Sequence, residues 1–363
     1  MKLGIVGLPN VGKSTLFNAL TNAGIQSANF PFCTVEPNIG VVAVPDNRLN
    51  LLAKIYNPKK VTCAFVKFFD IAGLVKGASK GEGLGNRFLS NIRESNAIIH
   101  VVRCFDEPEI IHVNGEVHPK ADVETIETEL ILSDLELIER KIQETKKFSK
   151  TSKANIRNLE FYEELKDFLG SGNPARLFKT NEDDLKLNNL NLLTNKPTIF
   201  VANVSEEDFV NGIENCKHYR NLKDIINNTN AAVIPICSEL EMQISDMSLE
   251  DKKVFLADLG LSNSSLDRLI TSCYELLGLI SFLTAGNSEV KAWTIKNGTK
   301  ASQAAGKIHS DIERGFIRAE IVPCEILLSC GSFSIAKEKG LVKSEGKDYI
   351  IKDGDVVLFR FNV

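Results

Sequence analysis

Nine residues near the N-terminus have the types and spacing needed to hold the phosphates of a nucleotide. Gly7-Leu-Pro-Asn-Val-Gly-Lys-Ser-Thr15 fits the P-loop pattern G-x-x-x-x-G-K-[ST]. The glycines let consecutive backbone N–H groups turn toward phosphate oxygens. Lys13 brings an ammonium to the β- and γ-phosphates, and the Ser14 hydroxyl is suited to ligate Mg²⁺. The pattern predicts a phosphate-binding loop.

The elements on either side of this loop are those that a P-loop needs. The apolar run 2–7 predicts a buried parallel strand, and the residues from Lys13 onward predict a helix whose N-terminus faces the phosphates. A chance glycine turn between a strand and a helix is the alternative. With strand, loop and helix in this order, we interpret the chain as a nucleotide-binding protein.

Two further residues are candidates for the magnesium site. The apolar run 64–70 predicts a strand that places Asp70 at its carboxyl end, where P-loop proteins carry an acid close to Mg²⁺. Gly73 follows and would turn its N–H toward the γ-phosphate. Thr34 lies in the proline-containing segment 30–38, where a threonine hydroxyl can reach Mg²⁺; a threonine that only caps a turn is the alternative.

The residue after Gly73 is Leu74, where Ras-like GTPases use glutamine to orient the attacking water. Leucine cannot hydrogen-bond, so another group must position the water. His112 follows the predicted strand 97–103 and is a candidate for that role, although a lone histidine is more often structural.

The base-recognition segment is Asn203-Val204-Ser205-Glu206, at the position where GTPases carry Asn-Lys-x-Asp. Glu206 is one methylene longer than the aspartate that accepts hydrogen bonds from guanine, and Val204 replaces the lysine that covers the base. A site that no longer fits guanine's donors loses its main discrimination against adenine. We predict that ATP is preferred over GTP.

The order of predicted elements indicates an α/β domain interrupted by helices. Predicted strands at 40–44, 64–70, 97–103, 197–203 and 231–237 alternate with helices. From 122 to 169, apolar residues at Ile131, Leu135, Ile138 and Ile142 predict a long helix in a helical hairpin. Basic residues near the hairpin tip suit contact with RNA phosphates, or form a solvated helix surface. Strands and a 299–316 helix predict a small C-terminal α+β module.

The composition and charge of the chain argue against some classes of protein. The 363 residues carry a formal net charge of −4 and 25% charged residues, so a globally basic nucleic-acid binder is not indicated and no DNA partner is expected. The eight cysteines form no C-x-x-C pair, which is typical of reduced thiols in a cytosolic protein. No apolar run approaches the ~20 residues of a membrane span. We expect a soluble, cytoplasmic protein.

These motifs, taken together, resemble the YchF subfamily of Obg-like ATPases. The resemblance rests on Gly-Leu-Pro-Asn-Val-Gly-Lys-Ser at 7–14, Asn-Phe-Pro-Phe-Cys-Thr-Val-Glu-Pro-Asn at 29–38, Asp-Ile-Ala-Gly-Leu-Val-Lys-Gly-Ala at 70–78 and Asn-Val-Ser-Glu at 203–206. It continues in the C-terminal part with Ala-Trp-Thr-Ile at 292–295, Gln-Ala-Ala-Gly-Lys-Ile-His at 303–309 and Asp-Gly-Asp-Val at 353–356. The resemblance covers essentially the whole chain.

The resemblance implies a three-part architecture. A Ras-like P-loop domain with a mostly parallel sheet would comprise 1–121 and 196–280, an inserted helical coiled coil 122–195, and a β-grasp TGS domain 281–363. It implies Mg²⁺-dependent ATP hydrolysis with weak intrinsic turnover. It also implies a role on the ribosome, on its large subunit, in translation or stress control, with RNA contacted through the coiled coil and the TGS domain.

The resemblance also assigns roles to individual residues. Lys13 and His112 would act in catalysis, with His112 replacing the missing glutamine, and Cys33 matches a cysteine linked to redox regulation. Ser14 and Thr34 would ligate Mg²⁺. The phosphates would be held by Asn10, Val11, Gly12, Lys13, Ser14 and Thr15, and the base by Asn203 and Val204. From residue types alone, Asp70, Gly73 and Glu206 are added to the nucleotide site.

Two alternatives to this function stay open at the level of the sequence. One is a GTPase switch of the Obg type, which keeps guanine recognition despite Glu206. The other is an RNA- or ribosome-binding module in which hydrolysis is incidental. A further hypothesis concerns cofactors: because Leu74 is apolar, Asn10 can help to hold K⁺ beside the phosphates.

Overall fold

The fold was analysed in a computed structural model of the chain, which describes residues 1–27, 38–71, 84–113, 115–148, 153–179, 184–229, 231–261 and 263–362. Thr34, Cys33, Gly73 and Leu74 therefore lie outside the described residues. The chain divides into two compact units. One contains Met1–Ala23 and Lys67–Leu266, and the other contains Val41–Val66 and Asp267–Val363.

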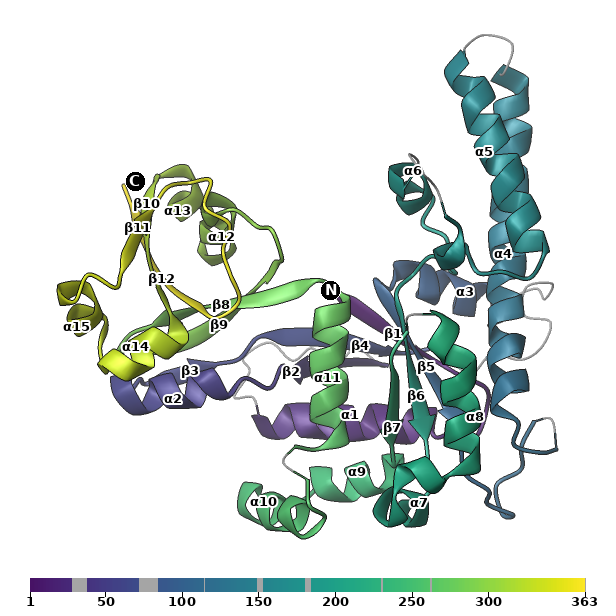
Figure 1. Cartoon of the computed structure of the whole chain (residues 1–363), viewed down its shortest axis with the longest axis horizontal. Helices are drawn as coiled ribbons and strands as arrows, with labels where there is room; N and C mark the ends of the chain where they lie inside the picture. The colour runs from purple at the N-terminus through teal and green to yellow at the C-terminus, as the bar shows by residue number, and fades with distance from the viewer. Residues whose placement is uncertain are drawn as a thin grey trace. The chain divides into compact units, whose positions relative to one another are not determined.

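The first unit is built on a six-stranded sheet of order β2-β4-β1-β5-β6-β7 (Figure 1). The strands are β2 (Ile39–Ala43), β4 (Phe65–Asp70), β1 (Lys2–Val6), β5 (Ala97–Arg103), β6 (Thr198–Asn203) and β7 (Val233–Ile236). The pairs β4–β1, β1–β5, β5–β6 and β6–β7 are parallel. Every residue of β5 and β6 is buried, as expected of central strands that are covered on both faces. The predicted α/β fold with a mostly parallel sheet is confirmed.

Helices connect and cover these strands. They are α1 (Lys13–Ser27), α3 (Leu84–Glu94), α7 (Glu206–Asn211), α8 (Lys217–Ile226), α9 (Ser238–Ser245) and α10 (Leu249–Asp258). The next helix, α11 (Ser265–Leu276), belongs to the second unit from Asp267 onward. Helix α8 buries Tyr219, Leu222 and Ile226 against Phe200 and other residues of one apolar cluster. Burial of a side chain of this size contributes roughly 1.5–3 kcal/mol to folding. Packing of this kind holds the strand ends, and the loops that follow them, in place.

The predicted helical hairpin is formed by α4 (Pro119–Phe148) and α5 (Lys153–Gly170), which run side by side and project from the sheet (Figure 1). Short helices η2 (Ala175–Leu177) and α6 (Asp184–Asn189) follow on the return to β6. The apolar stripe of α4 packs on that of α5 as predicted. The shared cluster includes Ile131, Ile138, Ile142, Phe161, Leu165 and Leu169.

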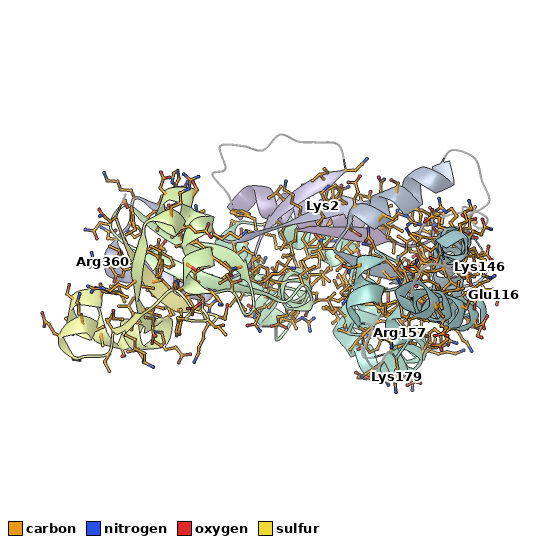
Figure 2. The ribbon with its side chains drawn as sticks, turned by 90° about the horizontal axis from the view of Figure 1, so that it is seen from above. Lys2, Glu116, Lys146, Arg157, Lys179 and Arg360 are labelled. Atoms are coloured by element: carbon orange, nitrogen blue, oxygen red, sulfur yellow. The ribbon has the colours of Figure 1, made fainter. Side chains whose placement is uncertain are left out.

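The basic residues of the hairpin are partly neutralised within the hairpin itself. Lys146 Nζ lies 3.0 Å from Glu163 Oε1, and Lys166 Nζ lies 2.8 Å from Glu139 Oε1. Figure 2 shows Lys146 and Arg157 among the side chains of the two helices. Exposed pairs of this kind add little stability, so both lysines can exchange their partners for external anions.

The second unit contains a six-stranded sheet of order β11-β10-β12-β8-β9-β3. Its strands are β3 (Lys60–Thr62), β8 (Leu279–Ala285), β9 (Glu289–Lys296), β10 (Phe316–Pro323), β11 (Lys343–Glu345) and β12 (Asp355–Phe361). Its helices are α2 (Asn47–Tyr56), α12 (Ala301–Ile308), α13 (Ser310–Arg314), α14 (Cys324–Cys330) and α15 (Phe333–Glu338). Aromatic packing of Phe282 against Trp293 and Phe359 lies in its core.

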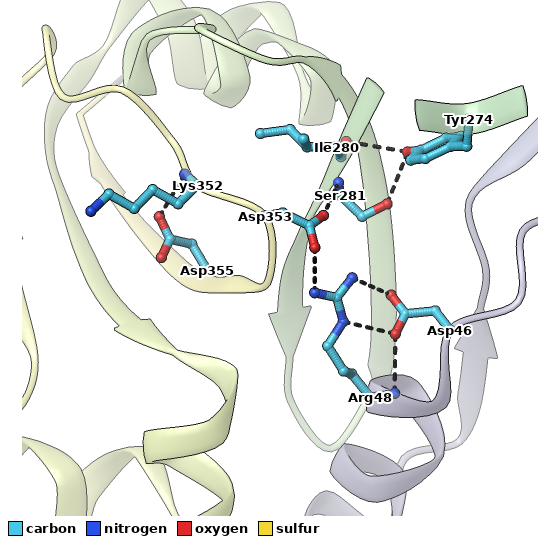
Figure 3. Close-up of polar contacts among 8 residues, drawn as sticks. All are labelled: Asp46, Arg48, Tyr274, Ile280, Ser281, Lys352, Asp353 and Asp355. Carbon is cyan, nitrogen blue, oxygen red and sulfur yellow. Dashed lines mark hydrogen bonds and ion pairs between the residues drawn. The ribbon is translucent and has the colours of Figure 1, made fainter. Parts of the chain in front are cut away.

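The segment Val41–Val66 is joined to the C-terminal residues by specific contacts. Strand β3 pairs with β9 in parallel, and the Arg48 guanidinium bridges Asp46 and Asp353 at 2.7–2.8 Å (Figure 3). Asp353 Oδ1 also accepts from the Ser281 N–H. This grouping places residues from the first 70 positions within the C-terminal unit. The three-part division expected from the sequence stays a prediction.

Two local predictions for the C-terminal unit were wrong. The helix predicted across 299–316 is two helices, because His309 adopts an extended conformation (φ −161°, ψ 144°) and caps the second helix through the Asp311 N–H. The strand predicted at 350–352 makes only an isolated bridge from Ile350 to Lys300. The chain turns directly after it at Asp353-Gly354, as predicted, and Gly354 has a φ of +79°.

The described residues contain neither a membrane-spanning helix nor a cluster of metal-ligating side chains. None of the helices in those ranges has the length and apolar character needed to cross a bilayer. In the same ranges, no three His, Cys, Asp or Glu side chains gather in a way that could hold a metal ion.

Asp134 joins the hairpin to the chain that returns to β6. Its carboxylate, fully buried on α4, accepts from the Leu193 N–H, the Thr194 N–H and the Thr194 hydroxyl at 2.7–2.8 Å. Burial raises the pKa of Asp134, and these donors oppose the shift. The carboxylate therefore satisfies two backbone donors that have no access to water.

We expect Asp134→Ala to lower the free energy of unfolding by about 2–4 kcal/mol, because it leaves these donors buried without an acceptor. Urea unfolding followed by circular dichroism measures the change. Glu136→Ala, an exposed acid on the same helix, is the matched control and should change stability by less than about 0.5 kcal/mol. Equal effects of the two substitutions would show that Asp134 does not anchor the hairpin.

Candidate functional site

The candidate site lies where the parallel strands end. The carboxyl ends of β1, β4, β5, β6 and β7 point the same way, because their pairings are all parallel. Ligands of open α/β sheets bind at this edge. The register sets Ile5 beside Asp70 and Arg103 beside Asn203, so the loops that follow these strands are neighbours.

The loop after β1 has the backbone that a phosphate cradle requires. Asn10 and Gly12 adopt positive φ angles of 62° and 87°, and the first hydrogen bond of α1 joins the Leu16 N–H to the Gly12 carbonyl at 3.0 Å. Val11 and Lys13 are buried, Thr15 is half-buried and Ser14 is exposed at the helix N-terminus. The side chains predicted to hold phosphates are thus gathered around one helix start.

Lys13 and Asp70 face each other beneath this loop. Lys13 Nζ lies 3.8 Å from Asp70 Oδ1, which is longer than a direct charge-assisted hydrogen bond. Asp70 Oδ1 is buried and accepts no hydrogen bond from the described residues. A carboxylate oxygen in this state fits the Mg²⁺ implied by the P-loop, because a metal-bound water would donate to it. Ser14 is the described hydroxyl suited to bind the metal; Thr34 and Gly73, the other predicted partners, lie outside the described residues.

Asn203, at the end of β6, links three loops with one side-chain amide. Its Nδ2 donates to the Val11 carbonyl at 2.9 Å, and its Oδ1 accepts from the Ser238 N–H at 3.0 Å. Gly12 lies so close that a Cβ there would collide with the amide nitrogen of Asn203. Asn203 therefore fixes the distance between the phosphate loop and the base-recognition segment.

Val204 and Glu206, the other two residues predicted to contact the base, differ in burial. Val204 is 2% exposed and belongs to the apolar cluster beside β6, so its side chain packs within the core. Glu206 is exposed at the start of α7, which Ser205 caps through the Asp208 N–H. Burial raises the pKa of Cys237, and the Glu206 carboxylate raises it further.

Ser238 is a site residue that the sequence reasoning missed. It begins α9 directly after β7 and is 2% exposed, and its Oγ has no hydrogen-bond partner among the described residues. A buried, unsatisfied hydroxyl costs about 1–3 kcal/mol, which a bound base can remove. The sequence signal was available, since Ser238 is the first polar residue after the apolar run 231–237.

His112 is buried rather than directed at solvent. Its Nε2 lies 3.0 Å from Asp122 Oδ2, and both side chains are 2% exposed. The preceding residue contacts the phosphate loop, because Asn10 Nδ2 donates to the Ile111 carbonyl at 3.1 Å. The backbone next to His112 therefore contacts the P-loop, whereas the His112 imidazole contacts Asp122 on α4.

Arg103, also missed from the sequence, ties this loop to the end of β5. Its buried guanidinium donates to the carbonyls of Phe105, Glu107 and Ile110 at 3.0–3.1 Å. One side chain therefore satisfies three backbone acceptors of an irregular segment, which fixes the path of the chain toward His112.

Comparison with known families gives two matches. Residues 2–134 match a family described as 50S ribosome-binding GTPase. Residues 279–362 match the YchF-GTPase_C family, which is described as a protein of unknown function. The first match contains the P-loop, Asp70 and His112, and the second lies within the C-terminal unit.

Individual relatives match over their full length. The chain is 51% identical over 362 residues to "Ribosome-binding ATPase YchF" of Bacillus subtilis, covering 99% of each chain. It is 49% identical to the protein of the same name from Escherichia coli O157:H7, covering 100% of this chain and 99% of the relative. Among solved structures, the Schizosaccharomyces pombe YchF GTPase matches with a TM-score of 0.90 and 37% identity, covering 99% of this chain and 97% of that one.

The bridging role of Asn203 gives a direct prediction. Asn203→Ala leaves the Val11 carbonyl and the Ser238 N–H unsatisfied and releases the P-loop from β7. We expect the affinity for nucleotide to fall by about 10- to 100-fold, measured by titration calorimetry with Mg²⁺ present. Asn211→Ala, an exposed asparagine on α7, should leave it unchanged. Unaltered affinity in Asn203→Ala would mean that this bridge does not shape the site.

Proposed function

The chain belongs to the YchF family, and from this premise we propose that it is a ribosome-associated P-loop ATPase that hydrolyses ATP with Mg²⁺ and GTP less well. It acts as a nucleotide-dependent switch in translation or stress regulation. The observation that carries the proposal is the Lys13–Asp70 pair beside the phosphate loop. Asp70 Oδ1 is buried there and accepts no hydrogen bond from the described residues, so a metal-bound water can donate to it. The relatives named as ribosome-binding ATPases support the choice of nucleotide and partner.

Each residue at the phosphate site has a separate proposed role in ATP hydrolysis. The backbone N–H groups of 10–15 bind the phosphates, and Lys13 neutralises charge on the transferring phosphoryl group. Ser14, together with Thr34, would hold Mg²⁺, which supplies further positive charge to the phosphates when it is bound. Gly73 would donate its N–H to the γ-phosphate, and His112 would orient the attacking water in place of the absent glutamine.

Recognition of the base is assigned to the residues at or just after the ends of β6 and β7. Asn203 and the buried face of Val204 would form the floor of the base site, and the Ser238 hydroxyl can both donate and accept. Adenine offers a 6-amino donor and an N1 acceptor, which such a hydroxyl suits. The exposed carboxylate of Glu206 is displaced by one methylene from the position that guanine's two donors require, so ATP is favoured.

The ribosome is the proposed partner, through its large subunit. The hairpin, with Arg140, Lys147 and Arg157 exposed near its tip, offers cations to RNA phosphates. The C-terminal unit, which the family resemblance assigns to the TGS type, is the second proposed RNA-contacting part. A ribosomal partner places the protein in the cytoplasm.

The choice of nucleotide is tested by calorimetry with ATP and GTP on the Mg²⁺-loaded chain. We expect ATP to bind at least about tenfold more tightly, which corresponds to 1.4 kcal/mol. Glu206→Asp, which restores the shorter carboxylate, should tighten GTP binding and leave ATP binding unchanged. GTP binding equal to or tighter than ATP binding in the wild type would favour an Obg-type GTPase instead.

A monovalent cation is the second proposed cofactor. Asn10 holds a left-handed conformation within the phosphate loop, and its amide oxygen is a ligand type that suits K⁺ beside the phosphates. We expect ATP turnover to rise when Na⁺ is replaced by K⁺ at constant ionic strength. Asn10→Gly, which tolerates the same backbone, should abolish the rise. An equal rate in both salts would exclude this cofactor.

A further inference from the structure

The loop that carries His112 has an inverted pattern of burial. Ile111 is 78% exposed and Val113 49% exposed, while His112 between them is 5% exposed. Apolar side chains in water and an imidazole in the interior are each the less favourable placement. A specific interaction must hold the histidine inside.

One such interaction is the contact with Asp122. Asp122 Oδ2 lies 3.0 Å from His112 Nε2, the nitrogen at the tip of the imidazole ring. The tip nitrogen is the one that reaches farthest from the backbone and is best able to bind a water at the phosphates. While it contacts Asp122, and with the side chain 2% exposed, His112 cannot orient an attacking water.

The rest of the loop is arranged so that a change at the P-loop reaches this contact. Arg103 fixes the chain as far as the Ile110 carbonyl. Beyond that point, Asn10 of the phosphate loop donates to the Ile111 carbonyl, next to His112. A nucleotide that shifts Asn10 therefore acts on Ile111, and through the backbone on the neighbouring His112.

We propose that Asp122 is a positioning residue that stores His112 away from the phosphates, and that hydrolysis requires His112 to leave it. This inference rests on the proposed role of His112 as the water-orienting group. It predicts slow turnover in the resting chain, since only the fraction of molecules with His112 released is competent. Asp122 lies in the first turn of α4, so displacement of the hairpin helix changes the same contact.

A second arrangement uses the same two residues with the opposite effect. In an acid–imidazole dyad the carboxylate orients the ring and increases its basicity, and its removal slows the reaction. Our proposal predicts a faster reaction, so the sign of the effect decides between the two. In a catalytic dyad, one ring nitrogen contacts the carboxylate and the other contacts the reactant. The burial of both the His112 and the Asp122 side chains therefore favours our proposal, because a buried imidazole does not reach the reactant.

The test compares turnover at saturating ATP and Mg²⁺ in the full chain with Asp122→Ala, Asp122→Asn, His112→Ala and Asp122→Ala/His112→Ala. We expect Asp122→Ala to raise kcat about tenfold, the effect of losing one hydrogen bond to a charged group. Asp122→Asn keeps a neutral acceptor and should give a smaller rise. The ATP dissociation constant should change less than about threefold in each variant. Glu124→Ala, an exposed acid on the same turn of α4, is the matched control and should match the wild type.

The double variant separates this inference from the proposed function. If it falls to the rate of His112→Ala, the rise in Asp122→Ala acts through His112, as proposed. A kcat that is unchanged or lower in both Asp122 variants, with His112→Ala also slow, would overturn storage and leave the role of His112 intact. If His112→Ala is as fast as the wild type, the proposed role of His112 fails, and storage fails with it.

Modification of His112 by diethylpyrocarbonate gives a readout that does not depend on turnover. We expect His112 to be protected in the wild type and to react at least about fivefold faster in Asp122→Ala, while the exposed His118 reacts equally in both. Equal protection of His112 in the two proteins would contradict the proposal even if Asp122→Ala were less stable.

Discussion

The side-chain amide of Asn203 is the constraint on which the site depends. Its Nδ2 donates to the Val11 carbonyl and its Oδ1 accepts from the Ser238 N–H. Asn203 at the end of β6 is thereby joined to the segments that follow β1 and β7. Because Gly12 packs directly against this amide, the phosphate loop cannot move without the base-recognition segment. The fully buried strands β5 and β6 hold Asn203 itself in place. The residues proposed to bind the phosphates and the base are therefore parts of one connected frame.

Catalysis is organised differently from binding. The binding groups lie at the sheet edge, whereas the proposed water-orienting group is buried against Asp122. Lys13 and Asp70 are separated by 3.8 Å, with an oxygen left for a donor. Binding thus uses groups already in place, and hydrolysis requires a rearrangement of His112. This division suits a switch, because a partner that displaces α4 can control turnover without touching the nucleotide.

Residues in local motifs were predictable from the sequence, and residues whose partners are distant were not. The P-loop, Asp70 and the helical hairpin follow from spacing and periodicity within a few turns of chain. Ser238 and Arg103 act through loops brought together by strand order, which spacing does not encode. His112 was identified as a candidate, but its burial on Asp122 depends on where α4 begins. The segment Val41–Val66 joins the C-terminal unit through the pairing of β3 with β9. The residues of β3 are over 200 positions from their partners, so spacing in the sequence does not reveal this pairing.

A crystal structure of the chain with Mg²⁺, ADP and tetrafluoroaluminate tests the central claim most directly. The account predicts that His112 Nε2 leaves Asp122 and lies within hydrogen-bonding distance of the water in line with the fluoroaluminate. Asn203 should still bridge Val11 and Ser238 and border the adenine. A bound complex in which His112 remains 3.0 Å from Asp122, with another group holding the water, would contradict it.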